Sequence, residues 1–267
     1  MTNNVCHGFI NKQIKSYHLK TWSKINKKKT NIIKLYVNEK NHLILKSEEV
    51  YFSTVGMFIP LNMRKFINFS YNSKIFSQII GHLLGDGNLT VTWSSKNAYF
   101  IFTQTIIRFE YVWFVFNNIK FLCYSMPRLG SSNRHGKTSY NIQVHTRSYP
   151  FLMQLYNDFY IKDNNDKKIK RVPFEMFYWL NPISLAYWAM DDGGNTSSGS
   201  GFYLHTKGFN FYDVYYLVGL IHYKFGINCT VQNHKSRPVI YIKSKSKERF
   251  IQLIYPYFHK TMLYKLK

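Results

Sequence analysis

The order of apolar and polar positions between residues 77 and 159 predicts a first set of alternating helices and strands. In the stretch 77–87 apolar residues recur at helical spacing, and we expect Gly87 to end this helix in a left-handed conformation. In the stretch 88–94 apolar and polar residues alternate strictly, which is typical of a strand with one buried face. Further patterns predict a strand at 99–105, a helix at 107–123, a strand at 140–147 and a helix at 150–159.

A second set of elements follows the charged stretch 162–171, which has no apolar face and is interpreted as a linker. We predict a helix at 184–192 ended by Gly193 and Gly194, a strand at 202–206, a helix at 209–225, strands at 230–234 and 239–243, and a helix at 247–257. Because the order repeats, one α/β unit is predicted to occur twice. The predicted domains are a basic N-terminal extension (1–70), a first half (71–165) and a second half (166–267).

Net charge narrows the class of partner. The 267 residues include 36 Lys and Arg against 13 Asp and Glu, which gives a formal net charge of +23. Lysines are densest at Lys27, Lys28 and Lys29. A charge of this size fits a polyanion, so nucleic acid is the first expected partner and an anionic membrane surface the second. Charges and amides interrupt every apolar run, so a membrane-spanning helix is not expected.

Residue usage indicates the setting. Phe and Tyr number 22 each, whereas alanine occurs only at Ala98, Ala186 and Ala189. This bias is typical of AT-rich codons and indicates an organellar or AT-rich bacterial gene; we favour an organelle, and a mitochondrion over a chloroplast. Neither a disulfide framework nor a structural zinc site is predicted, because the cysteines are far apart and form no C-x-x-C pair: Cys6, Cys123 and Cys229.

Two short apolar segments carry the candidate chemistry: IIGHLLGDG at 79–87 and LAYWAMDDG at 185–193. Gly81 and Gly85 lie on one helical face, where small residues let two helices pack closely. If the segments pack side by side, the carboxylates of Asp86 and Asp192 emerge close together and repel unless a cation lies between them. Carboxylate oxygens favour a hard divalent ion such as Mg²⁺.

Both segments resemble the signature motif of the LAGLIDADG homing endonucleases, in the single-chain form with two copies, and the resemblance covers residues 76–267. It implies an α+β fold in which two pseudo-symmetric αββαββα halves pack through the motif helices and their sheets form a saddle over duplex DNA. It also implies a monomer that cuts both strands of a long specific site by Mg²⁺-assisted hydrolysis, with Mn²⁺ as a substitute.

The resemblance assigns roles by position. Asp86 and Asp192 would bind the metal together with the main-chain carbonyls of Gly85 and Asp191. The Asp191 side chain has no counterpart in the first motif, so we interpret it as a helix cap or as support for the ligands. The lysines expected beside the two scissile phosphates are Lys170 and Lys265.

DNA contacts are expected on the outward faces of the strands, because alternate side chains of a β-ribbon reach base edges in the major groove. The expected DNA-contacting residues form these rows: Asn141, Gln143, His145 and Arg147; Thr90, Thr92 and Ser94; Thr230, Gln232 and His234; and Lys243 beside Tyr241. Scattered lysines, including those of the extension, would contact phosphates. Four tryptophans are expected in the core: Trp93, Trp113, Trp179 and Trp188.

Three functions are compatible with these motifs. The first is a site-specific double-strand DNA endonuclease of intron homing. The second is an intron maturase, which would bind its own intron RNA on the same scaffold. The third is a DNA-binding regulator without nuclease activity. Asp86 and Asp192 are both present, which favours cleavage and leaves a dual role open.

Overall fold

The computed structural model describes residues 54–71, 73–94, 96–134, 137–163, 165–196, 199–206 and 208–267. Most of the predicted N-terminal extension, including its lysine run at 27–29, lies outside the described residues. Residues Met57–Lys267 form one compact unit, and the architecture below is that of this unit.

The first half alternates helices and strands in the order αββαββα. Its elements are α4 (Lys74–Leu84), β1 (Gly87–Val91), β2 (Ala98–Thr105), α5 (Phe109–Ile119), β3 (Arg128–Arg134), β4 (Lys137–His145) and α6 (Pro150–Phe159), with 3-10 turns at Ile106–Arg108 and Lys120–Leu122. The strands form one antiparallel sheet in the order β1-β2-β4-β3. Its inner face, with Leu89, Phe100, Phe102, Ile142 and Val144, is buried against these helices.

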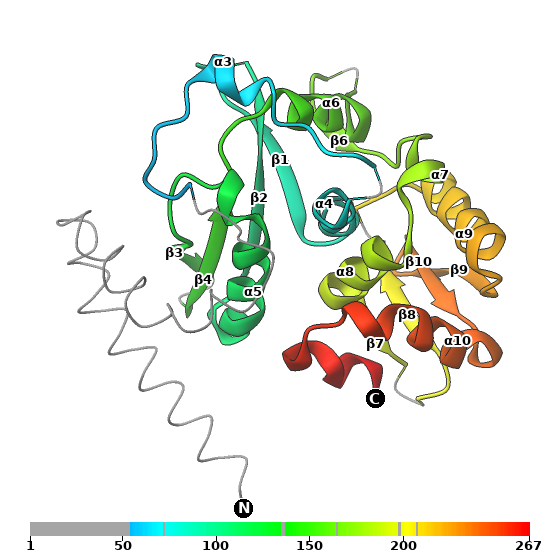
Figure 1. Ribbon diagram of the computed structural model, residues 1–267. Helices are drawn as coiled ribbons and strands as arrows, with labels where there is room; N and C mark the ends of the chain where they lie inside the picture. The colour runs from blue at the N-terminus through cyan, green and yellow to red at the C-terminus, as the bar shows by residue number, and fades with distance from the viewer. Residues whose placement is uncertain are drawn as a thin grey trace, which may run out of the picture. The chain divides into compact units, whose positions relative to one another are not determined.

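The second half repeats this arrangement. Its elements are α8 (Pro182–Asp192), β7 (Gly193–Asn195), β8 (Phe202–His205), α9 (Phe211–Phe225), β9 (Cys229–His234), β10 (Arg237–Ile242) and α10 (Ser244–Ile254), followed by 3-10 turns at Tyr255–Tyr257 and Lys260–Leu266. The strand order β7-β8-β10-β9 is the equivalent of the order in the first half. The predicted α+β fold with two αββαββα halves is therefore confirmed (Figure 1).

Local sequence signals explain several helix boundaries. In α8, Asn181 and Ser184 cap each other's backbone N–H groups and Pro182 occupies the first turn. Helix α9 begins after Asn210, whose side chain accepts a hydrogen bond from Asp213 N, and ends at Gly226 with φ 63°. These caps fix where the helices start and stop.

Helices α4 and α8 pack side by side between the two sheets (Figure 1). A Cβ on Gly81 would lie 2.5 Å from the Ser184 carbonyl oxygen and 2.6 Å from Tyr187 Cβ, so only glycine allows this approach. On the α8 side, Ala186 and Ala189 are fully buried. The prediction that small residues let the two motif helices pack closely is confirmed.

The end of α4 differs from the prediction. The helix ends at Leu84, Gly85 is its C-cap with φ −102°, and Gly87 is already the first residue of β1. The predicted left-handed Gly87 is therefore wrong. Glycine is needed there for space, because a Cβ would lie 2.7 Å from the His82 carbonyl oxygen.

Strand β1 is shorter than predicted. It ends at Val91, so Thr92 and Ser94 lie in the following turn, where Thr92 Oγ1 donates to the Asn97 carbonyl. Trp93 in the same turn is fully exposed. Its expected place in the core is wrong, whereas Trp179 and Trp188 are buried and Trp113 is half-buried.

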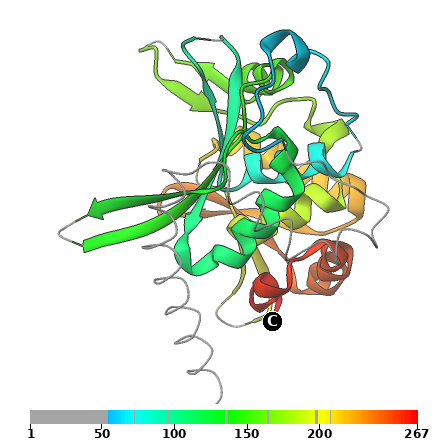
Figure 2. The same ribbon diagram turned by 60° about the vertical axis from the view of Figure 1, so that its left-hand side comes forward.

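The predicted linker at 162–171 is partly ordered as a hairpin. Strands β5 (Tyr160–Lys162) and β6 (Lys168–Lys170) pair, with an exposed turn between them (Figure 2). The hairpin is attached to β1, because Tyr160 Oη donates to Asn88 Oδ1 at 2.7 Å and Lys168 Nζ donates to the Leu89 carbonyl. The predicted boundary between the halves at 165/166 falls in this turn.

Two edge strands were missed. Strand β3 reads RLGSSNR and β7 reads GGN, and both lie at the edge of their sheets. Neither segment alternates apolar and polar residues, because an edge strand needs little burial to be held by its hydrogen-bonded neighbour. The pairing of β3 with β4 makes a long hairpin that projects from the first half (Figure 2).

Residues 57–70, which the prediction assigned to the N-terminal extension, lie in the compact unit that begins at Met57. This segment contains the short helix α3 (Leu61–Arg64). The Arg64 guanidinium donates to Ser148 Oγ at 3.3 Å, and Phe69 packs edge-on against Phe151. These contacts hold the segment on the first half.

Two expectations from composition can be compared with the described residues. Cys123 and Cys229 are free thiols, and burial raises the pKa of each to about 12. Among the helices that the structure describes, none combines the length and apolar character needed to cross a bilayer.

Candidate active site

The two motif carboxylates lie at the ends of α4 and α8. Asp86 lies between the α4 cap and β1, and Asp192 is the last residue of α8. Burial, followed by the charges of Asp86 and Asp191, raises the pKa of Asp192 to about 7. Desolvation and the charge of Asp191 also raise the pKa of Asp86. Asp86 thus lies close enough to Asp192 to disfavour the ionised form of Asp192.

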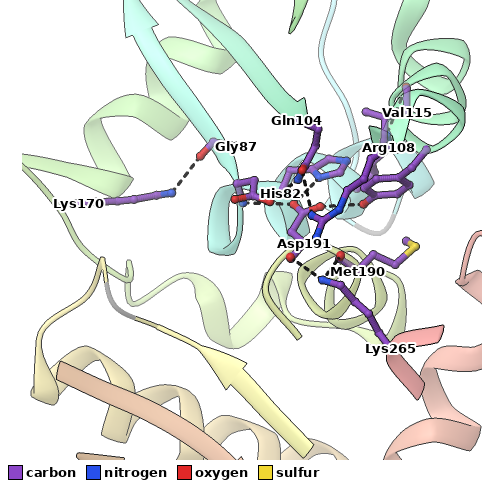
Figure 3. A network of polar contacts seen from close by, with 12 residues as sticks. His82, Gly87, Gln104, Arg108, Val115, Lys170, Met190, Asp191 and Lys265 are labelled. Carbon is purple, nitrogen blue, oxygen red and sulfur yellow. Dashed lines mark hydrogen bonds and ion pairs between the residues drawn. The ribbon is translucent and has the colours of Figure 1, made fainter. Parts of the chain in front are cut away.

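A third acid, Asp191, forms a buried polar network between the motif helices (Figure 3). Its Oδ2 lies 2.8 Å from His82 Nδ1 and accepts a hydrogen bond from Asp86 N at 3.3 Å. Its Oδ1 accepts a hydrogen bond from Tyr111 Oη at 2.8 Å. The Asp191 side chain, which belongs to the second half, therefore contacts three groups of the first half.

Two further polar side chains surround Asp86. Gln104 Nε2 donates to Asp86 Oδ2, and Arg108 Nη1 donates to Gln104 Oε1 at 3.0 Å (Figure 3). Gln104 occupies the inner face of β2, after the buried Phe100 and Phe102. The amide of Gln104 therefore contacts the Asp86 carboxylate directly, and the guanidinium of Arg108 contacts that amide.

The surroundings of Asp192 differ. In the sheets Gly87 faces Phe102 and Gly193 faces Leu204, so Gln104 corresponds to Thr206. Thr206 is buried and its Oγ1 donates to the Pro238 carbonyl at 2.7 Å. Asp192 therefore lacks the amide partner that Asp86 has.

A pocket of about 290 Å³ opens beside Asp192. The residues that line it are Leu84, Gly85, Lys170, Asp192, His205, Thr206, Gly208 and Phe209. It joins the end of α4, the end of α8 and the loop after β8, so it contains groups from both halves.

The two predicted lysines are both held by main-chain carbonyls next to the motif acids (Figure 3). Lys170 Nζ donates to the Gly87 carbonyl at 3.0 Å, and Lys265 Nζ donates to the carbonyls of Met190 at 2.6 Å and Asp191 at 2.7 Å. Burial lowers the pKa of each lysine to about 8, although the nearby aspartates act in the opposite direction. Lys265 is buried despite its place near the end of the chain.

The donor set fits a hard divalent cation held partly by a substrate. Within the described ranges, no group of three or more His, Cys, Asp or Glu side chains could hold a metal ion. Burial and the charges of Asp86 and Asp191 raise the Asp192 pKa, so a positive charge placed there would stabilise the ionised form. Mg²⁺ commonly uses one or two carboxylates, waters and substrate phosphates, which suits this pair. The Asp191 carbonyl retains a second lone pair beside its bond to Lys265.

Most residues expected to contact DNA lie on the outer faces of the sheets. In the first half, His145, Gln143 and Asn141 face Ile101, Thr103 and Thr105 across β2 and β4, and all but the exposed Thr105 are half-buried. Thr90 lies on the same side of β1. In the second half, Thr230 is half-buried and Gln232 and His234 are exposed on β9. Both sheets therefore present polar side chains away from the helices.

Four expected contacts lie elsewhere. Arg147 is buried beyond the end of β4, where its guanidinium donates to the carbonyls of Cys123 at 2.5 Å and Met57 at 2.6 Å, so its predicted place on the outer face is wrong. Thr92 and Ser94 lie in the turn after β1. Lys243 is exposed but caps the start of α10, one residue beyond β10.

Sequence reasoning missed His82, Gln104, Arg108 and Tyr111. Two of them carried a signal: His82 interrupts an otherwise apolar helix, and Gln104 occupies an inward position of a strand whose other inward residues are apolar. No local pattern marks Arg108, although its partner Gln104 is only four residues away. Tyr111 carries no local signal because its partner Asp191 is distant in sequence.

Comparison with known proteins gives consistent matches. Residues 76–250 match the LAGLIDADG DNA endonuclease family. Cytochrome b mRNA maturase bI2 of Saccharomyces cerevisiae is 31% identical over 206 residues, covering 73% of this chain and 48% of the yeast protein. The chain thus spans about half the length of that relative.

Two other matches cover more of the compared protein. Probable intron-encoded endonuclease 1 of Wickerhamomyces canadensis is 29% identical over 194 residues, covering 70% of this chain and 81% of the relative. The solved structure of the homing endonuclease I-WcaI bound to its DNA recognition sequence is similar with a TM-score of 0.67 and 28% identity, covering 74% of this chain and 88% of that chain.

Proposed function

This chain belongs to the LAGLIDADG DNA endonuclease family, and from that premise we propose that it is a monomeric, site-specific endonuclease of intron homing. Its substrate would be double-stranded DNA with a long recognition site. The reaction would be hydrolysis of one phosphodiester bond in each strand.

The observation that carries the proposal is the meeting of Asp86 and Asp192 at the ends of two packed motif helices, each within reach of a lysine's charge. A carboxylate that is desolvated and lies near other carboxylates is unfavourable unless a cation or a proton is supplied. Pairs of this kind are characteristic of functional sites.

Asp86 and Asp192 would hold Mg²⁺, or Mn²⁺ in its place, with the main-chain carbonyls of Gly85 and Asp191 as further oxygen donors. A bound divalent ion supplies Lewis-acid stabilisation of the phosphate oxygens and lowers the pKa of water. That chemistry suits the two carboxylates and needs no protein nucleophile.

The protein's own groups would manage protons and orientation. Lys170 and Lys265, with pKa values near 8, can exchange a proton close to neutral pH and can also stabilise a negative phosphate. Gln104 would orient the Asp86 carboxylate, with Arg108 holding Gln104 in place. These groups would act only when DNA brings a phosphate to the acids.

The outer sheet faces would contact the DNA. We assign base-edge contacts to Thr90, Asn141, Gln143, His145, Thr230, Gln232 and His234, with Thr92, Ser94 and Lys243 at the margins. Lysines around the sheets would neutralise phosphates, so affinity should fall steeply with salt.

Selection of cleaved sites from a randomised duplex library in Mg²⁺ tests the proposal directly. The wild-type protein should enrich one long sequence cut in both strands. Asp192→Asn, an isosteric change, should bind the enriched sequence but make no double-strand cut. Enrichment of no sequence, or full cleavage by the variant, would count against the proposed roles.

A second function has its own support. Two relatives at 31% and 30% identity, from Saccharomyces cerevisiae and Debaryomyces hansenii, are named cytochrome b mRNA maturases. We therefore keep an intron RNA maturase as the alternative, with the chain's own intron RNA as partner, and place the protein in an organelle, a mitochondrion in preference to a chloroplast. Equal affinity for the host intron RNA and for a shuffled RNA of the same length would argue against this second function.

A further inference from the structure

The two motifs differ at one pair of equivalent positions. Position 85, before the acid of the first motif, is glycine, and position 191, before the acid of the second, is aspartate. A Cβ on Gly85 would lie 2.5 Å from Asp191 Cβ and 2.8 Å from Asp191 Oδ2. The space that Gly85 leaves open is therefore filled by the side chain of Asp191.

The contacts of Asp191 point to the first carboxylate site. Its Oδ2 accepts from the Asp86 backbone N–H, and the same oxygen lies 2.8 Å from the buried His82 Nδ1. His82 packs against Phe102, and Tyr111 Oη holds the other oxygen. The backbone at Asp86 is thus tied to a buried anchor supplied by the other half.

The relationship is not reciprocal. Glycine at position 85 has no side chain that could bond the Asp192 backbone in the same way. The residue equivalent to His82 in the second motif is Trp188, whose fully buried ring cannot replace an imidazole that shares a carboxylate. Among the described residues, the hydrogen bond from a motif helix to the backbone of the opposite motif's acid is therefore found at Asp86 and not at Asp192.

We propose that Asp191 is a positioning residue for the carboxylate site at Asp86, and that it fixes the chain at residues 85–87 from the opposite half. The inference rests on the proposed endonuclease function. If this is so, the cutting rates of the two DNA strands depend unequally on Asp191. Loss of Asp191 slows the cutting of one strand more than the cutting of the other.

Three variants of the full chain test this role. Asp191→Ala removes every contact, Asp191→Asn keeps an oxygen that can accept from Asp86 N–H, and Tyr111→Phe removes one contact of Asp191 without touching Asp86. Tyr111→Phe is the matched control for general loss of stability in the buried network. Thermal unfolding of each variant measures that loss.

Two readouts separate positioning from structure. Hydrogen exchange of the metal-free protein should increase at residues 85–87 in Asp191→Ala and stay at the wild-type level in the other two variants. On a selected duplex labelled in each strand, Asp191→Ala should change the ratio of the two nicking rates by about fivefold or more, and the other variants by less than about twofold.

The proposal is overturned if Asp191→Ala leaves exchange at 85–87 unchanged, if Tyr111→Phe increases it equally, or if both strands slow by the same factor. Absence of cleavage by the wild-type protein would contradict the proposed function instead. In that case the exchange experiment alone still decides whether Asp191 positions the chain at Asp86.

Discussion

Gly85 and Asp191, which occupy equivalent positions in the two motifs, lie directly against each other across the α4–α8 interface. The first motif has a glycine at this position, and the buried carboxylate of Asp191 from the second motif fills the space. The two halves are therefore complementary at their interface, although their elements follow the same order. Because of this complementarity, a side chain added at position 85 would overlap Asp191.

Gly81→Ala should destabilise the protein by about 1–3 kcal/mol, because the added methyl group would meet backbone and Cβ atoms of α8. The matched control is Gly219→Ala on the exposed side of α9, which has no neighbour within 4 Å and should stabilise by about 0.5–1 kcal/mol. Urea unfolding of the metal-free protein measures both. Equal effects of the two substitutions would contradict the close packing of the motif helices.

Substitution of Arg147 should affect mainly stability, whereas substitution of His145 should affect mainly DNA binding. Arg147→Met removes the donor to the buried Cys123 carbonyl and to the part-buried Met57 carbonyl, and should cost about 1–3 kcal/mol of unfolding free energy. His145→Ala, on the outer face of β4, should change stability by less than about 0.5 kcal/mol but weaken DNA binding severalfold. Denaturation and binding at one fixed salt concentration distinguish them; the opposite pattern would reverse the two assignments.

Truncation should reveal where the compact unit begins. Removing residues 1–53 should preserve folding, whereas removing 1–70 also deletes Arg64, Phe69 and the Met57 carbonyl that Arg147 binds, and should lower the melting temperature. We further expect the shorter deletion to weaken DNA binding, most strongly at low salt, without abolishing cleavage. Identical melting temperatures for the two truncated chains would refute the packing of residues 57–70.

The requirement for Mg²⁺ should depend on pH through Asp192. Because its pKa is raised to about 7, the carboxyl gains a proton as pH falls below 7, and a cation must displace that proton. The Mg²⁺ concentration for half-maximal cleavage should therefore rise about fivefold between pH 7 and pH 6 and change little between pH 8 and pH 9.

The matched control for this prediction is Asp166→Asn. Asp166 is an exposed acid in the β5–β6 turn, paired with Lys162, so its loss should leave the Mg²⁺ profile unchanged. A half-maximal Mg²⁺ concentration that is the same at pH 6 and pH 8 in the wild-type protein would remove Asp192 from the cation site.

The sequence predicted correctly those helices and strands in which apolar residues recur regularly and a clear signal, such as proline, marks the end of the element. Helix α6 begins at Pro150 and ends at Phe159 as expected, because proline favours the first helical position and the apolar spacing continues to that end. The motif helices were found from their apolar segments, and the two acids at their ends are brought together as expected.

The remaining differences have physical causes that a local pattern does not contain. Arg147 continues the alternation of β4, but β4 ends at His145 and the chain turns the guanidinium into the first half. Trp93 looks like a core residue by type, yet the sheet ends before it. The links between Gln104 and Asp86, and between Tyr111 and Asp191, join residues far apart in sequence and depend on packing.

The connection between the halves has a practical consequence. Strands β5 and β6 pair across an exposed turn, and both are attached to β1 by side-chain hydrogen bonds. If the polypeptide were opened within that turn, each fragment would keep one strand of the hairpin and one motif helix. Reassembly would then restore the hairpin and the helix interface together, so the molecule is suited to conversion into a two-piece, conditionally reconstituted tool.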